Sequence, residues 1–92
     1  MMVEMFIIYD SKGGLYNKPF CFINRQVALR AAADLMADAD SEIRRHPEDY
    51  SLWHIGQYDD VEGQIHLFEQ RDCLVRFHEM PIPADEVLKQ EN

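Results

Sequence analysis

The chain has 92 residues, which is enough for one domain with a small core. Because 47% of the residues are hydrophobic, the composition excludes a disordered protein, and no run approaches the roughly 20 apolar residues of a transmembrane helix. A net charge of −8 makes the chain as a whole a poor counterion for DNA or RNA, so a DNA contact would require a local basic patch.

The first half of the sequence predicts a strand, a turn and a helix. Residues 2–10 carry apolar side chains on both faces, which indicates a central strand. Residues 12–14, "KGG", favour a turn, and residues 20–23 a short second strand. Asn24 is a suitable N-cap for the helix that follows. The apolar stripe of this helix consists of Val27, Ala28, Ala31, Ala32, Leu35 and Met36.

The second half predicts a short helix and a β-hairpin. A helical turn at residues 41–46 ends at Pro47 and leads into a strand over residues 50–60. Gly63 is expected at positive φ in the hairpin loop, from which the chain returns as a strand at residues 64–69.

A further turn is expected at residues 70–72, followed by a strand at 73–78 that pairs with the hairpin. If Tyr58 opposes Ile65 and Leu67 opposes Val75, the sheet has two distinct faces. The face that receives the helix then carries Leu52, Tyr58, Ile65, Leu67, Val75 and Phe77. The outer face carries Trp53, Ile55, Gln57, His66, Phe68, Leu74, Arg76 and His78. This outer face suits either a dimer interface or a stacking platform.

These elements predict an α+β domain over residues 3–78: a small antiparallel sheet of about four strands with one main helix packed on one face. Residues 79–92 carry four acids against one lysine, and they are expected to form a flexible acidic tail. The N-terminal segment lacks the features of a secretory signal peptide, so Cys21 and Cys73 are expected as reduced thiols.

The histidines and acids do not match the spacing of a metal site or a catalytic site. Histidines occur at His46, His54, His66 and His78, which are 8 or 12 residues apart, whereas zinc ligands cluster at short spacings. His46, Glu48 and Asp49 have the composition of an acid–base group, but a chain this small has little room for both a core and a pocket. We therefore expect a protein that is not an enzyme and has no metal or other cofactor.

Basic and aromatic side chains are interleaved near the N-terminus. Lys12 and Lys18 bracket Tyr16, a composition typical of single-strand binders, in which bases stack on rings and cations hold phosphates. The loop leads to a helix N-terminus, which can hold an anion, although an ordinary solvated loop is the alternative. The candidate nucleic-acid-binding residues are Lys12, Tyr16, Lys18, Arg25 and Arg30, together with Trp53 and Arg76 on the expected outer face.

The order of three segments resembles a known family. "FIIYDSKGGLYNKPF", "NRQVALRAAADLM" and "HPEDYSLWHIGQYDDVEGQI" are similar to the small non-structural protein of gokushovirus-like microviruses, which are single-stranded DNA phages. The resemblance covers residues 5 to 66, and "HPEDY" with "IGQYDDVEGQI" is its specific part. The matching positions are Tyr9, Asp10, Tyr16, Pro19, Phe20, Ala28, Leu35, Ser41, His46, Pro47, Glu48, Asp49, Tyr50, Leu52, Ile55, Gly56, Tyr58, Asp59, Gly63 and Ile65. The chain departs from the pattern at "ADADSEI" and "RDCLVRFHEM".

The resemblance implies a DNA-binding protein in the cytoplasm of the bacterial host, acting when replication switches from duplex to single-stranded genomes for packaging. No catalytic residue carries over. Its partner would be single-stranded or replicative-form phage DNA, bound weakly and in a salt-sensitive way, and no membrane. The half-apolar outer face favours a homodimer. The alternative is a protein–protein adaptor that contacts phage replication, scaffolding or host proteins without binding DNA, which the acidic balance and the tail favour.

Overall fold

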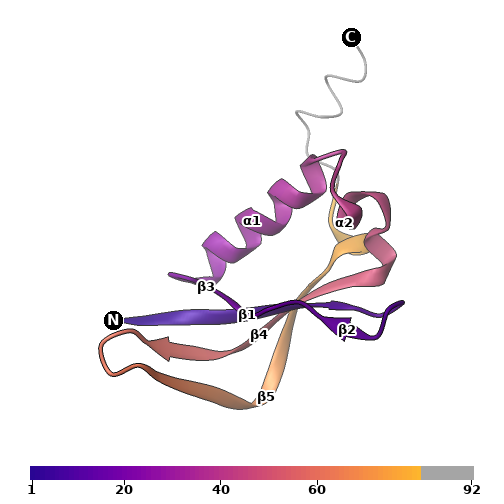
Figure 1. Cartoon of the computed structure of the whole chain (residues 1–92). Coiled ribbons are helices and arrows are strands. Elements are labelled where there is room, and N and C mark those ends of the chain that lie inside the picture. Colours follow the sequence, from indigo (N-terminus) through magenta and orange to yellow (C-terminus); the bar gives the residue numbers. More distant parts are fainter. Residues whose placement is uncertain (82–92) are drawn as a thin grey trace.

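The computed structural model describes residues 1–81, in which one long helix lies over one side of an antiparallel sheet (Figure 1). The strands are β1 (Met2–Asp10), β2 (Leu15–Tyr16), β3 (Phe20–Phe22), β4 (Tyr50–Asp59) and β5 (Gln64–Arg76). The helices are α1 (Arg25–Ala37) and α2 (Glu42–Arg45), with 3₁₀ turns η1 (Pro47–Asp49) and η2 (Phe77–Glu79). This confirms the predicted α+β class. Most of the predicted tail, residues 82–92, lies outside the described residues.

Strand β1 is the centre of the sheet, as its apolar pattern predicts. It pairs with β4 on one side and with both β2 and β3 on the other, all antiparallel, in the order β2-β1-β4-β5. Between β2 and β3, Asn17 forms hydrogen bonds to β1 in place of regular strand pairing. Its N–H donates to the carbonyl oxygen of Ile8 at 3.0 Å, and its Oδ1 accepts from the Ile8 N–H at 2.7 Å. The edge of the sheet is thus one strand interrupted at Lys18 and Pro19.

Helix α1 begins and packs as its sequence predicts. The Asn24 side chain accepts a hydrogen bond from the Val27 N–H at 2.9 Å, so one orphan donor of the first turn is satisfied. Small side chains on the buried stripe let the helix approach the sheet closely. The core consists of Phe6, Ala28, Ala32, Met36, Ile43, Leu52 and Phe77. In the described part of the chain, no helix has the length and hydropathy needed to span a membrane.

The predicted turn at residues 70–72 is wrong, because β5 is one continuous strand from Gln64 to Arg76. The predicted pair of Tyr58 with Ile65 is confirmed, but Val75 pairs with Leu52 and not with Leu67. Between the pairs Gly56–Leu67 and His54–Asp72, residues 68–71 of β5 stand opposite Ile55 alone. This wide bulge, which we call the β5 bulge (residues 68–71), bends the strand instead of reversing it.

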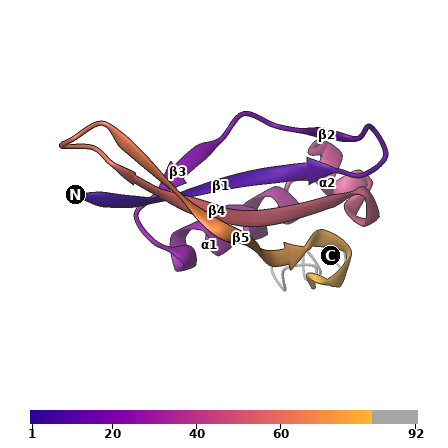
Figure 2. The same cartoon turned by 90° about the horizontal axis from the view of Figure 1, so that it is seen from below.

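The bend carries β5 beneath the sheet, on the side away from α1. Seen from below, β5 crosses in front of β4 and β1 (Figure 2). Its course explains why Met5 and Ile7, which alternate along β1 with the core residue Phe6, are themselves only 7% and 8% exposed. The sheet is therefore strongly curled, and its lower side is partly covered by its own last strand.

The predicted faces are half right. Leu52, Val75 and Phe77 contact the core beneath the helix, as predicted. Tyr58, Ile65 and Leu67 were expected there and lie on the other side. Tyr58 pairs with Val3 of β1 and with Ile65 of β5. Gly56 pairs in the same way with Met5 and Leu67. Because paired residues project to the same face and Val3 and Met5 alternate with Phe6, Tyr58, Ile65 and Leu67 lie on the side away from Phe6. Leu74, expected on the outer face, packs against the core. The bulges change which face each following side chain of the strand points to. A prediction that assumes unbroken pairing between the strands therefore assigns these side chains to the wrong face.

The β4–β5 hairpin loop is held by a carboxylate, and this predicts a pH effect. Asp59 Oδ1 accepts from the N–H groups of Val61 and Glu62 at 3.0 and 3.2 Å, and Gly63 adopts φ +67° as predicted. The two backbone donors lower the pKa of Asp59 below its ordinary value. The carboxylate thus stabilises the fold at any pH above its unfolded-state pKa, and this stabilisation is lost as the pH falls through the folded-state pKa.

We expect a carbon-detected NMR titration to place the Asp59 carboxyl below its ordinary range. In Asp59→Asn, the amide oxygen can still accept from the loop, but it does not titrate in this range. This variant should therefore lose the part of the acid destabilisation that comes from Asp59. A midpoint at or above the ordinary value would contradict the assignment.

Candidate nucleic-acid interface

Two tyrosines and an arginine form a cluster at the β2 end of the sheet, which we call the Tyr16 cluster (Tyr9, Tyr16 and Arg71). Tyr9 and Tyr16 are cross-strand partners, with ring centroids 4.6 Å apart and planes inclined by 36°. The guanidinium carbon of Arg71 lies 5.3 Å from the Tyr16 ring centroid, a cation–π distance. Tyr16 is still 51% exposed, so its ring is accessible to a ligand.

The two predicted lysines flank β2 beside this cluster, with Lys12 in the turn between β1 and β2 and Lys18 between β2 and β3. Asp10 Oδ1 accepts from the N–H groups of Lys12 and Gly13 at 3.0 and 3.1 Å, which fixes the turn between β1 and β2. Lys12 and Lys18 are both exposed. Within residues 1–81, neither lysine forms an ion pair. Their charges are therefore available to an anion from solution.

Arg71 was not predicted as a site residue, because it falls in the segment expected to be a turn. It reaches Tyr16 only because the β5 bulge passes beneath the sheet. No local pattern in "EQRDC" signals this contact, which joins residues far apart in sequence.

Helix α1 holds the next two predicted residues, but on the opposite side of the sheet from the β5 bulge (Figure 1). Arg25 is engaged within the protein: its Nε donates to His54 Nδ1 at 2.9 Å and its Nη2 pairs with Asp72 Oδ2 at 2.6 Å. Arg30 is exposed beside Gln26 and Val27. The structure thus ties Arg25 to Asp72, which follows Arg71 in β5, and leaves Arg30 on the exposed surface of the helix.

Trp53 and Arg76, the remaining predicted residues, line one hollow of about 170 Å³. Trp53 is half-buried and its Nε1 donates to Ser51 Oγ at 2.9 Å, while Arg76 Nε lies 3.9 Å from a Glu79 carboxylate oxygen. The same hollow is lined by Tyr9, Ser11, Glu48, Asp49, Tyr50, Ser51 and His78. Two carboxylates in this set would repel a phosphate, so the hollow is less suited to a DNA backbone than the Tyr16 cluster.

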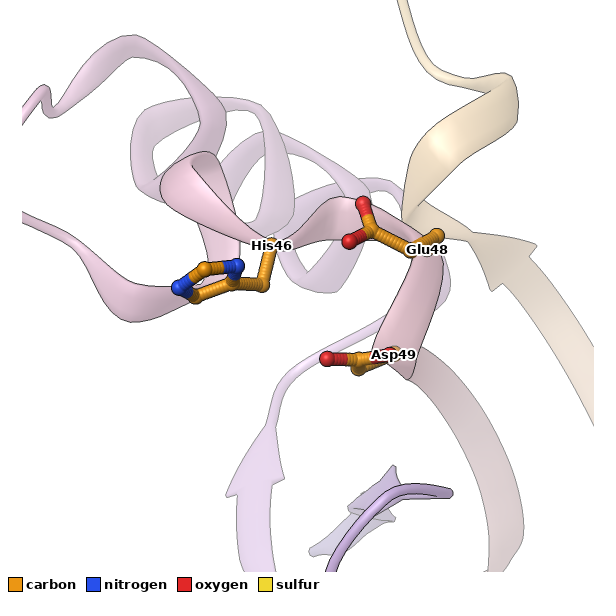
Figure 3. Close-up of side chains that lie close together, drawn as sticks. All are labelled: His46, Glu48 and Asp49. Atoms are coloured by element: carbon orange, nitrogen blue, oxygen red, sulfur yellow. The ribbon is translucent and has the colours of Figure 1, made fainter.

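The acid–base group seen in the sequence is a real cluster. His46, Glu48 and Asp49 each offer one ligand atom, and these atoms lie within 4.8 Å of one another around the η1 turn (Figure 3). The spacing between histidines does not reveal this cluster, because its other two members are carboxylates of the same short turn and not histidines. His46 and Glu48 are exposed, so a cation here would compete with bulk water. The cluster therefore defines neither a metal centre nor a catalytic site by itself.

A chain of polar side chains centred on the buried His54 connects four elements of the fold, and we call it the His54 network (Glu4, Arg25, His54, Gln57 and Asp72). Surface or half-buried histidines were expected, but His54 is only 3% exposed. Since the Nε of an arginine can only donate, Nδ1 of the imidazole must accept, and Nε2 then donates to Glu4 Oε1 at 2.9 Å. Gln57 Nε2 donates to the same carboxylate at 3.2 Å. The imidazole is thus held between a guanidinium and a carboxylate.

Aromatic rings cover both sides of this imidazole. Phe6 stacks on it with centroids 4.8 Å apart, and Phe68 meets it edge-on at 4.7 Å. Burying an imidazole costs little free energy when both of its nitrogens form hydrogen bonds, but it costs much more when one partner is lost. The network therefore orients α1 and β5 on the sheet and is part of the scaffold. Arg25, whose side chain is 47% exposed, is held in one direction by His54 and Asp72.

Comparison with known proteins identifies one family. A family model described as "Phage ORF5 protein" matches residues 3–80. No curated protein and no solved structure matches the chain.

Proposed function

The chain belongs to the Phage ORF5 protein family, and on that premise we propose that it is a non-enzymatic phage protein that binds single-stranded DNA through the Tyr16 cluster. The observation that carries the proposal is Arg71 over the ring of Tyr16, with Tyr9 beside it. A base can stack on an exposed aromatic ring, and a guanidinium next to the ring can hold the adjoining phosphate.

The neighbouring lysines extend this surface. Lys12 and Lys18 are exposed before and after β2, the strand that carries Tyr16, so phosphates on either side of a stacked base would meet a cation. The chain as a whole has a charge of −8, which opposes long-range attraction of DNA. Binding should therefore be weak and should fall with rising salt.

The wider role we propose follows the resemblance in the sequence. The protein would act in the cytoplasm of the infected bacterium, in a single-stranded DNA phage, where it binds the genome as synthesis changes from duplex to single strands. We propose that it works as a homodimer formed through the lower side of the sheet. Support comes from the large apolar side chains exposed there, Ile65 at 58% and Leu67 at 66%.

Fluorescence anisotropy with labelled oligonucleotides at about 50 mM salt tests the proposal. Tyr16→Ala should weaken binding to single-stranded DNA by about tenfold, since stacking of one base contributes about 1–3 kcal/mol. Arg71→Gln should weaken it as well. Arg45→Gln is the matched control, because Arg45 is an exposed arginine on α2 and should leave the affinity unchanged. Lack of saturable binding by the unmodified protein, or equal loss in all three variants, would refute this site.

A further inference from the structure

An apolar groove of about 420 Å³ lies between α1 and the sheet. Its apolar lining consists of Ile8, Phe20, Phe22, Ala28, Ala31, Ala32, Leu35, Leu52 and Phe77. This volume is in the range of pockets that hold organic ligands or anchoring side chains. The groove is on the helix side of the sheet, so it is separate from the Tyr16 cluster.

The sequence explains why the groove exists. The alanines of the α1 stripe bring the helix close to the sheet but do not fill the space next to them. On the sheet, β3 supplies Phe20 and Phe22, whose rings pack at 78° and leave a wall that is half-buried. The hollow is thus a product of small residues on the helix and large rings on a short strand.

The charges on the groove are of one sign. Its charged lining residues are Asp34, in the last turn of α1, and Asp38, the C-cap residue of the same helix. In the part of the chain from residue 1 to 81, no cation pairs with either carboxylate, although Asp38 Oδ1 accepts from the Asp40 N–H at 2.9 Å. Two carboxylates beside an apolar wall favour a cation more strongly than the same groups in open water.

The negative charge of Asp34 and Asp38 favours some occupants of the groove over others. The chain's own last residues, 82–92, contain Asp85, Glu86 and Glu91 against Lys89, so they carry the same sign as the rim. A second copy that met this groove in a symmetric contact would bring its own Asp34 and Asp38 to the same rim, so it is poorly complementary here. A segment of another protein with apolar side chains and a basic end fits both the wall and the rim.

We propose that the groove between α1 and the sheet binds a short apolar peptide segment of another protein, with a Lys or Arg of that segment placed at Asp34 and Asp38. The apolar side chains of the segment bury against Phe20, Phe22 and Leu35. The site is independent of DNA binding, so each can fail without the other.

A fluorescein-labelled amphipathic peptide made only of leucine and lysine is a suitable probe, with a leucine–glutamate peptide of the same pattern as its counterpart. Anisotropy titration of the full chain at about 150 mM salt should show saturable binding of the first and none of the second. Ala31→Trp, which fills the groove, should abolish binding. The double variant Asp34→Asn, Asp38→Asn should weaken it by about three- to tenfold.

Two controls separate the groove from bulk attraction of a basic peptide to an acidic protein. The double variant Glu62→Gln, Glu69→Gln makes the same change in charge on the exposed hairpin and should leave the affinity unchanged, as should Tyr16→Ala. A thermal melt checks that the Ala31→Trp variant is folded. If that variant is unfolded, the double variant of Asp34 and Asp38 still tests the site.

Three results would overturn the proposal. Equal binding by the groove and hairpin variants would mean that only net charge attracts the peptide. Binding that is absent in the full chain but gained on removal of residues 82–92 would mean that the chain fills its own groove. Self-association in sedimentation experiments that Ala31→Trp abolishes would identify a second copy as the occupant.

Discussion

Replacing Gly56 with alanine should destabilise the protein by about 3 kcal/mol, a large part of the stability of a domain of this size. A Cβ at this position would lie 2.4 Å from the carbonyl oxygen of His66 and 2.9 Å from the Cα of Leu67. Both are backbone atoms of the paired strand β5, so the clash cannot be relieved by rotating a side chain. The strands would have to separate where the β5 bulge begins.

Urea denaturation of Gly56→Ala measures this effect, and Gly63→Ala is the matched control. Gly63 has φ +67°, but no atom lies within 4 Å of a Cβ built there, so alanine should cost only the backbone strain of about 1 kcal/mol. If the two variants lose the same stability, the close approach of β5 to Gly56 is not what requires glycine there.

Replacing His54 with phenylalanine should cost about 2–3 kcal/mol, although it preserves the aromatic stack between Phe6 and Phe68. The loss comes from the partners left behind. The side chain of Glu4, which is 17% exposed, keeps only the donor of Gln57, and the Nε of Arg25 loses its acceptor. Leaving a largely buried carboxylate facing an apolar ring is the main penalty.

A double-mutant cycle isolates that penalty. Glu4→Leu combined with His54→Phe replaces both partners by apolar groups, so the pair of changes should cost clearly less than the sum of the single variants in urea denaturation. Strictly additive losses would show that Glu4 and His54 do not stabilise each other.

The elements that could be predicted from the sequence are those specified by neighbouring residues. Asn24 and the stripe behind it define α1 without reference to the rest of the chain. The continuous apolar pattern of residues 2–10 identifies a central strand, and Gly63 marks the hairpin loop. Each of these features satisfies a local requirement for a cap, a period or a backbone angle.

The errors concern contacts between distant residues. The turn expected at residues 70–72 depended on the composition "QRD", whereas the actual path of β5 is set by its pairing with β4 on both sides of the bulge. The same cause affects the site. Arg25 was predicted to contact DNA, which stays a prediction. Its hydrogen bonds to His54 and Asp72, 29 and 47 residues away, could not be seen in the sequence. Arg71 gains its place beside Tyr16 only through the bulge.

The interruptions at the two outer strands have a consequence for the protein in concentrated solution. A flat exposed strand recruits further copies strand by strand, which is how fibrils grow. On one edge, Asn17 uses its side chain as a backbone substitute, and Lys18 and Pro19 follow it. On the other edge, the β5 bulge breaks the straight row of donors and acceptors. Neither edge described in residues 1–81 offers a long template, so a chain rich in exposed β-structure is protected against amyloid-like stacking.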